Sequence, residues 1–306
     1  MDIFLGLFNN VLTEGFIYAI MAVGVYVTYA VMNFPDLSVD GTFPLVACVT
    51  GALILNGVNP WVACLVSFLC GAAAGCVTGL LHVKLHITDL LSGILVMTAL
   101  TSINLVVTGG TSMVAYFSKP TIFNYGLGAA LSAAAGSWGP ALLALICCAV
   151  VKLAIDLYLK TKSGLLLRAA GDNPQYVISL GKDPGNMNIL GLMIGNGCAA
   201  LAGSILSQQS GSANVWSGTG MVVMALASVI IGTSLFGRAK IIRPTLAAVF
   251  GTIIYKACLV AAMQLGLPTN YLKLLMAILL TIALVANNMA PVAGRRKKQD
   301  VNPTQI

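Results

Sequence analysis

The residues of this chain that could do chemistry are ionisable side chains scattered through apolar sequence, and their spacing favours binding over catalysis. His82 and His86 lie four residues apart, but no Glu follows His82 as in the H-E-x-x-H zinc motif, so contact with lipid headgroups is the simpler interpretation. The G-x-x-x-x-G-K-[ST] phosphate-binding loop is missing too. The sequence therefore predicts no catalytic residue, no metal site and no cofactor held by this chain.

Charges inside apolar segments are costly and mark functional positions by default. Lys152 and Asp156 lie four residues apart and are expected to pair with each other. Lys256 has no carboxylate near it in sequence, so we expect it to face either a translocation path or a carboxylate of another helix. Asp36 and Asp40 flank a short segment after Pro35, which is either a re-entrant turn at membrane depth or a surface turn.

These charges and a few amides and hydroxyls are the candidates for a solute pathway. The predicted pathway residues are Asp36, Asp40, Thr101, Asn104, Asn196 and Lys256. Hydrogen bonding between helices explains the uncharged members equally well.

The longest polar interruption between apolar blocks runs from Lys160 to Asn186 and carries four basic residues. Asn173 is a good helix N-cap, Pro174 suits the first helical position, and Gly181 suits the left-handed residue after a helix end. These signals predict a two-turn helix from Pro174 to Leu180, with Tyr176, Val177 and Leu180 on one apolar face. Such a short helix needs support, either from its own bundle or from a groove on a soluble partner.

Composition places these residues in a membrane protein. The 306 residues are 58% hydrophobic and 8% charged, against roughly 25% charged in a soluble domain. The formal net charge of +7 does not indicate a nucleic-acid partner, because most of the basic residues cluster between or after apolar segments. All eight cysteines lie in apolar segments without metal-ligand spacing, so we interpret them as packing residues.

About 20 apolar residues cross a bilayer, and on this measure the chain contains nine candidate helices. They are Thr13 to Met32, Val39 to Leu55, Trp61 to Leu81, Leu90 to Val107, Trp138 to Leu159, Met187 to Ser207, Met221 to Phe236, Pro244 to Leu265 and Tyr271 to Asn288. The basic run Arg295 to Lys298 predicts a cytoplasmic C-terminus, and alternation then places the N-terminus and the loop 108–137 outside.

Two features of these helices concern packing. Gly71, Gly75 and Gly79 recur every four residues, as do Gly191 and Gly195, and small residues at this spacing let helices approach closely. Five helices separate the start of the first candidate from the start of the sixth, so a repeat of helices one to four in six to nine would be inverted.

Three blocks together resemble a known family. They are YAIMAVGVYVTYAVMNFPDLSVDGTFPLVACV, GLLHVKLHITDLLSGILVMTALTSINL and RAAGDNPQYVISLGKDPGNMNILGLMIGNGCAALAGSIL. In order and separation they are similar to permease subunits of ATP-binding-cassette (ABC) importers of the branched-chain amino acid permease family, nearest the tryptophan and tyrosine transport branch. The similarity covers about Gly15 to Asn288.

This resemblance implies an all-α, inverted-repeat permease core like that of the vitamin B12 importer, with the Asn173 helix as its cytoplasmic coupling helix. The implied ATPase-coupling residues are Arg168, Gly171, Asp172, Asn173, Pro174, Tyr176, Val177, Leu180 and Gly181. Arg168, Ala169, Ala170 and Gly171 stand where the general importer signature begins Glu-Ala-Ala, so this part of the motif differs.

The resemblance also implies the partners. They are a second permease copy, two cytoplasmic ABC ATPase subunits that bind ATP and Mg, and an extracytoplasmic solute-binding protein that delivers an aromatic or branched-chain amino acid or a related compound. We therefore expect a single permease domain over residues 1–293, a coupling segment at 160–186 and a basic tail at 294–306, in a bacterial cell membrane. The alternative is an ion-coupled secondary transporter, which would need no ATPase.

Overall fold

A computed structural model describes residues 2–236, 243–266, 268 and 271–289. Most of them are helical. The helices are α1 (Asp2–Val25), η1 (Tyr26–Val31, a π-helical turn), α2 (Val39–Leu55), α3 (Pro60–Leu85), α4 (Asp89–Val107), α5 (Leu127–Ala135), η2 (Gly136–Trp138), α6 (Gly139–Tyr158), α7 (Lys162–Asp172), α8 (Pro174–Ser179), α9 (Pro184–Ser210), α10 (Met221–Phe236), α11 (Pro244–Gln264) and α12 (Leu272–Met289). Two short strands, β1 (Met113–Ala115) and β2 (Ser212–Asn214), pair antiparallel.

Each predicted apolar segment is a helix, and several begin where local chemistry favours a start. Asn59 accepts the Trp61 amide at 3.0 Å ahead of Pro60, and Asp183 accepts the Gly185 amide at 2.8 Å ahead of Pro184. Six helical segments in the described part of the chain are long and apolar enough to cross a membrane, whereas α2, α10 and α12 contain shorter apolar stretches. The chain is thus a multi-pass, all-α membrane protein, and nine crossings remain a prediction.

Helix α9 lies at the centre of the bundle, in contact with α1, α2 and α3. The predicted glycine spacing produces its closest contact, because a Cβ on Gly75 would lie 2.3 Å from the Leu192 carbonyl oxygen and one on Gly71 would lie 2.7 Å from that of Asn196. On the opposite side, a Cβ on Gly24 of α1 would lie 2.7 Å from the Gly195 oxygen. Glycine at these positions lets three backbones meet almost without side chains between them.

The helix-to-helix contacts made by α1, α2, α3 and α4 recur among α9, α10, α11 and α12. Helix α1 packs on α11 as α9 packs on α3, and α2 packs on α9 as α10 packs on α1. Within each set, α2 contacts α3 and α4, and α10 contacts α11 and α12. This pattern agrees with an internal repeat of α1–α4 in α9–α12.

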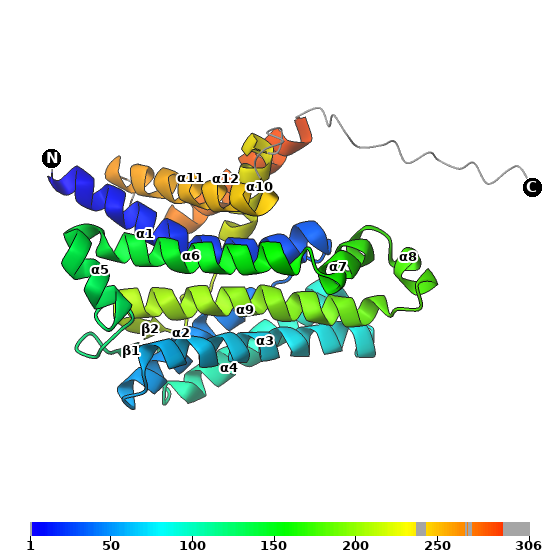
Figure 1. Cartoon of the computed structure of the whole chain (residues 1–306), viewed down its shortest axis with the longest axis horizontal. Coiled ribbons are helices and arrows are strands. Elements are labelled where there is room, and N and C mark those ends of the chain that lie inside the picture. The colour runs from blue at the N-terminus through cyan, green and yellow to red at the C-terminus, as the bar shows by residue number, and fades with distance from the viewer. Residues whose placement is uncertain (1, 237–242, 267, 269–270, 290–306) are drawn as a thin grey trace, which may run out of the picture.

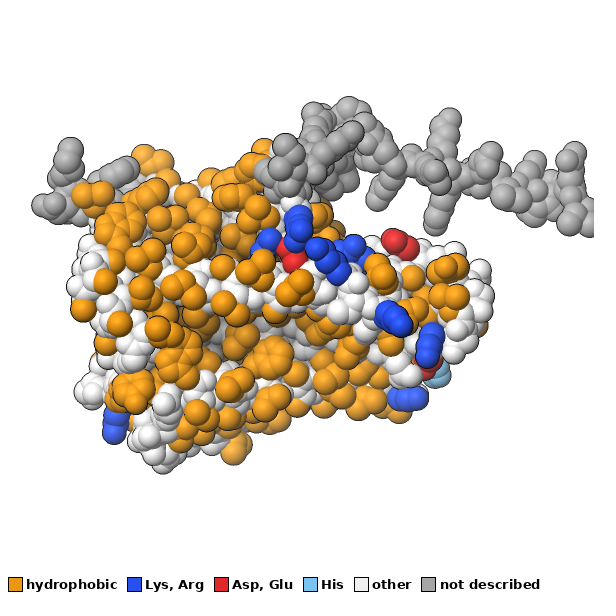
Figure 2. All heavy atoms as spheres, in the orientation of Figure 1, with side chains coloured by type: hydrophobic (Ala, Val, Ile, Leu, Met, Phe, Trp, Pro, Cys, Tyr) orange, Lys and Arg blue, Asp and Glu red, His pale blue; other side chains and the backbone are white. Residues whose placement is uncertain are grey.

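Figure 1 shows the long helices side by side, with α7 and α8 projecting at one end and α5 with the β pair at the other. Figure 2 shows apolar side chains over most of the bundle surface, while basic side chains gather toward the α7 and α8 end. The sequence predicted a short helix at the first of these ends and a loop at the other, and α5, α7 and the two strands are additions that the structure makes.

Candidate functional site

The segment 160–186 forms the most exposed polar end of the described bundle. Helix α8 begins as predicted, because the Asn173 side chain accepts the amides of Gln175 at 3.1 Å and Tyr176 at 3.4 Å, with Pro174 in the first turn. Helix α8 ends at Ser179, and Gly181 adopts φ +68°. The start, the stop and the short length of this helix are therefore set by the residues predicted from sequence.

The predicted apolar face of α8 is wrong in one residue. Val177 has 0% exposure and packs toward its own chain, whereas Tyr176, Ile178 and Leu180 are 56%, 60% and 51% exposed. Of the two supports proposed from sequence, the structure shows the first: Val177 holds the helix to its own bundle, while support from a soluble partner stays a prediction. Arg168, Asp172, Asn173, Pro174 and Gly181 are also exposed.

The neighbouring helix α7 is attached to the end of η1. A Cβ on Gly171 would lie 1.9 Å from the Val31 oxygen, so only glycine allows this approach. The Asn33 side-chain amide donates to the Gly171 oxygen at 3.1 Å, and Asn33 itself has φ +56°. A displacement of α7 and α8 would thus act directly on the turn at Asn33.

After that turn, the chain goes back into the bundle. Asp36 is 4% exposed, and its carboxylate accepts the Ser38 hydroxyl at 2.6 Å and the Asn196 side-chain amide at 2.6 Å. The Thr42 hydroxyl donates to the other end of the Asn196 amide at 2.8 Å. Because Asn196 lies near the middle of α9 and Phe34, Asp36 and Ser38 are buried, the segment 34–38 packs inside the bundle and is not a surface turn. A re-entrant position at membrane depth stays a prediction.

Asp40 connects α2 to the start of α10. Its carboxylate accepts the backbone amides of Gly220 at 3.0 Å and Val222 at 2.8 Å, which are the free donors at the start of α10. A Cβ on Gly218 would lie 1.9 Å from the Asp40 carbonyl oxygen, so the segment before α10 lies directly against the first turn of α2. The two short helices therefore begin beside each other.

The remaining predicted pathway residues lie apart from this network or at its edge. Asn104 is fully buried, donates a long 3.5 Å bond to the Gly41 oxygen and has a side-chain oxygen without a partner in the described residues. Thr101 is partly exposed and donates to the Met97 oxygen of its own helix at 2.9 Å. A role of these residues in a pathway stays a prediction.

Lys256 pairs with a carboxylate of another helix, one of the two alternatives from sequence. The Lys256 ammonium contacts Glu14 of α1 and lies 5.3 Å from the centre of the Tyr18 ring. Glu14 is a residue that sequence reasoning missed. An acidic side chain at position 14 inside the first apolar block was the available signal.

The pairing of Lys152 with Asp156 is confirmed at 2.8 Å, and Asp156 has further partners. Arg243 donates to it at 3.0 Å and the Thr245 hydroxyl at 2.6 Å, which connects α6 to the start of α11. Arg238, Lys240 and the basic tail 294–306 lie outside the described residues.

The two histidines lie at the end of α3 and do not share a helix face. His82 lies near the end of α3, with Nδ1 2.9 Å from the Ile87 oxygen and 3.3 Å from Asp89 Oδ1. His86 follows the helix with φ +54°, so the turn rotates its side chain away from the α3 register. His82 thus holds the turn between α3 and α4.

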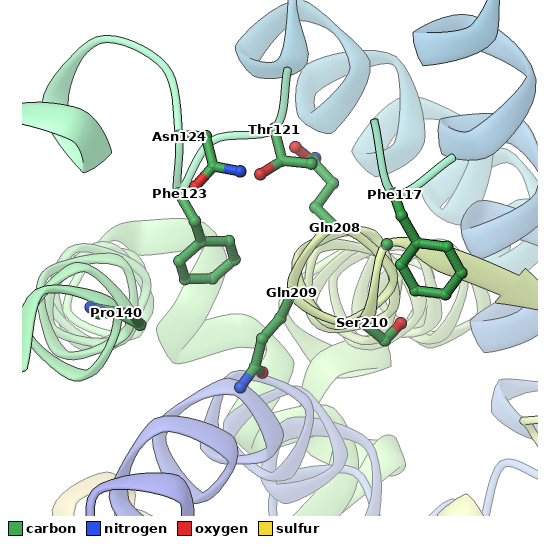
Figure 3. A pocket seen from close by; sticks show the side chains of 9 residues that line it. Phe117, Thr121, Phe123, Asn124, Pro140, Gln208, Gln209 and Ser210 are labelled. Atoms are coloured by element: carbon green, nitrogen blue, oxygen red, sulfur yellow. The ribbon is translucent and has the colours of Figure 1, made fainter. Parts of the chain in front are cut away.

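At the opposite end from α8, a cavity of about 290 Å³ opens among the loop 117–124, the start of α6 and the end of α9 (Figure 3). Its lining residues include Phe117, Thr121, Phe123, Asn124, Gln208 and Gln209. We call it the outer pocket. The loop aromatics and the two glutamines lie more than 80 positions apart in the sequence, and the fold brings them together.

Comparisons with known proteins agree on one kind of protein. The family model described as "Branched-chain amino acid transport system / permease component" matches residues 7–284. The chain is 42% identical to a tyrosine transport system permease protein of Clostridioides difficile over 280 residues, covering 92% of this chain and 91% of that protein. It is 27% identical to the ribose import permease protein RbsC of Escherichia coli K12 over 282 residues, 91% of this chain and 84% of that protein.

A further relative is the autoinducer 2 import system permease protein LsrC of Salmonella paratyphi B. The two chains are 28% identical over 244 residues, which are 77% of this chain and 66% of that protein. No solved structure matches this chain.

Proposed function

This chain belongs to the branched-chain amino acid transport system permease family, and from that premise we propose that it forms the translocation pathway of an ABC importer for a neutral amino acid. The single observation that carries the proposal is helix α8, capped at both ends and held by one buried valine, with three apolar side chains left exposed at the basic end of the bundle. An exposed, well-anchored helix of this kind suits a groove on a soluble partner.

The proposed solute is an aromatic or branched-chain amino acid. The support is the 42% identity to a protein named for tyrosine transport, over nearly the whole length of both chains. Relatives at 27% and 28% identity are named for ribose and autoinducer 2. The fold that these proteins share therefore does not determine which solute is carried. An extracytoplasmic binding protein would deliver it.

The partner proposed for α8 is a cytoplasmic ATPase, which would hold ATP and Mg. Two ATPase subunits present two equivalent grooves and one chain supplies one α8, so a second permease copy completes the importer. The basic side chains at the α8 end support a cytoplasmic location for this end in a bacterial cell membrane, with the N-terminus outside.

The contacts of α7 provide a route from this partner to the interior. A movement of α8 would displace α7 and, through Gly171, the turn at Asn33. That turn leads to Asp36, which bonds to Asn196 near the middle of α9. Two of these steps leave little room for adjustment, because Gly171 lies directly against the Val31 oxygen and the Asp36 to Asn196 bond is buried. In this proposal, ATPase movement changes how the segment 34–38 packs on α9.

Co-purification of the ATPase with the permease tests the proposal. Leu180→Asp places a charge on the exposed apolar face, and recovery of the ATPase should fall about tenfold or more, since desolvating an unpaired charge at a contact costs several kcal/mol. Gln175→Asp is the matched control, because it adds the same charge to an exposed polar position of α8.

Both variants should enter the membrane and elute as the wild type does. Equal recovery of the ATPase with Leu180→Asp, Gln175→Asp and the wild type would reject α8 as the coupling helix. Val177→Asp is unsuitable for this test, because its buried position makes loss of the fold the expected result.

A further inference from the structure

Asp40 and Lys273 bring opposite charges to the segment 215–220, which precedes α10. The half-buried Asp40 carboxylate accepts the Gly220 amide at 3.0 Å. The exposed Lys273 ammonium, at the start of α12, donates to the neighbouring Thr219 hydroxyl at 2.9 Å. The two charges interact through space, but no ion pair among the described residues joins them. A carboxylate and an ammonium group therefore flank the start of α10 without neutralising each other by contact.

This pair of charges lies far from both ends of α9. Thr42, two residues after Asp40, donates to the Asn196 side chain at 2.8 Å, and Asn196 is near the middle of α9. Asp40 therefore lies near that level of the bundle, and the Lys273 ammonium, one residue away along the segment 215–220, lies close to it. Charged side chains in such a position are costly unless they face protein, water or a ligand.

The surface around the two charges differs from the rest of the bundle. Helices α4, α2, α10 and α12 contact one another in that order, and Thr98 and Ser102 of α4 and Thr281 of α12 are exposed. By contrast, every exposed residue from Val62 to Leu80 of α3 and from Leu142 to Leu157 of α6 is apolar. Lipid tails match the surfaces of α3 and α6, whereas the row from α4 to α12 is better matched to water, a polar solute or another protein chain.

Two opposite charges that are held apart match the two ends of an amino-acid zwitterion. The solute carboxylate pairs with the Lys273 ammonium, and the solute ammonium group pairs with Asp40. The Asp40 carboxylate has about four acceptor positions and uses two of them for the amides at the start of α10, so it has capacity for a further donor. A solute with one charge or none would leave Lys273, Asp40 or both without a partner.

We propose that Asp40 and Lys273 form a solute site at the junction of α2, α10 and α12, which binds an amino acid by its α-carboxylate and α-ammonium groups. Lys273 is a residue that the predicted pathway did not include. The inference rests on the proposed function and adds to it a site within the permease itself. This site recognises the charges that amino acids share and does not select the side chain.

The test is equilibrium binding of three radiolabelled compounds to the full chain in phosphatidylcholine nanodiscs. The compounds are L-tyrosine, tyramine, which lacks the carboxylate, and N-acetyl-L-tyrosine, which lacks the ammonium charge. Lys273→Met should weaken binding of L-tyrosine about 10- to 100-fold, because one charge-assisted bond is lost, and should not weaken binding of tyramine. Asp40→Asn should weaken binding of L-tyrosine and tyramine but not of N-acetyl-L-tyrosine.

The matched control is Lys119→Met, which removes the same charge from an exposed lysine of the loop 117–124. This variant should bind all three compounds as the wild type does. Because Lys273 is exposed, Lys273→Met should also keep the unfolding midpoint of the wild type, so a loss of binding in it cannot come from a loss of the fold.

Three results would overturn the inference: no binding of L-tyrosine by the wild type, wild-type affinity for L-tyrosine in Lys273→Met, or equal losses for L-tyrosine and tyramine in that variant. Uptake of L-tyrosine by cells carrying the complete importer separates the site from the function. Uptake that Lys273→Met leaves unchanged would reject the site and leave the importer proposal in place. Absence of amino-acid uptake in the wild type would reject the amino-acid function.

Discussion

Replacing Asp40 by Asn perturbs the contact that joins α2 to the start of α10. In the wild type, both carboxylate oxygens accept amides at the start of α10, from Gly220 at 3.0 Å and Val222 at 2.8 Å. An Asn side chain has nearly the same shape but keeps only one acceptor oxygen and turns an N–H group toward the second amide. One charge-assisted bond is lost, together with the favourable position of a negative charge at a helix N-terminus.

The expected cost follows from these two bonds. A hydrogen bond to a charged group contributes about 1.5–3 kcal/mol to stability, and this is the loss we expect for Asp40→Asn. At roughly 2 °C per kcal/mol for a chain of this size, the midpoint of thermal unfolding should fall by about 3–6 °C. Asp183→Asn is the control, because Asp183 also accepts a helix-start amide, is exposed, and Asn is an equally good N-cap.

The assay is thermal unfolding of the purified chain in nanodiscs, combined with hydrogen exchange at the start of α10. Asp40→Asn should speed exchange of the Gly220 and Val222 amides, and Asp183→Asn should leave both the midpoint and those amides unchanged. The reasoning is refuted if the two substitutions lower the midpoint equally, or if the α10 amides keep wild-type protection in Asp40→Asn.

Two further predictions concern packing and charge inside the bundle. Gly75→Val drives a side chain into the Leu192 backbone and should destabilise the chain by about 1–3 kcal/mol or more, whereas Ala73→Val on the exposed side of α3 should not; equal unfolding midpoints would contradict the close α3 to α9 contact. Glu14→Gln leaves the Lys256 ammonium without its counter-charge and should cost about 3–5 kcal/mol in thermal unfolding, while the double change with Lys256→Met should recover most of that loss; a double variant as unstable as the single one would argue against the pair.

Local sequence determined the positions of the helices and the form of the coupling segment. The predicted spans Val39–Leu55 and Met221–Phe236 match α2 and α10, because the apolar runs and their polar ends are properties of neighbouring residues. The cap at Asn173 was also predictable, since its bonds reach only two and three residues along the chain. Composition and basic clusters, read in the same way, predicted a multi-pass membrane protein.

Other features could not be predicted, because the sequence pattern that marks them is too short or does not show what a helix face contacts. Strands β1 and β2 have three residues each, too few to show alternation, and lie about a hundred residues apart. The face of α8 was assigned from spacing alone, and spacing groups residues on a face without showing what covers it. Val177 therefore appeared to be a partner contact although its own bundle buries it.

The tertiary structure alone decided what the charged and amide side chains do. Asp36 meets Asn196 across 160 positions and Asp40 meets Val222 across 182, and the sequence gives no distance for such pairs. The same holds for Gln208 and Gln209, which look alike in sequence, although both ends of the Gln208 amide are bonded and the buried Gln209 oxygen has no partner in the described residues. Helix formation depends on residues within one turn, whereas the partner of a buried polar group depends on which helices pack together, and that packing is set by the whole chain.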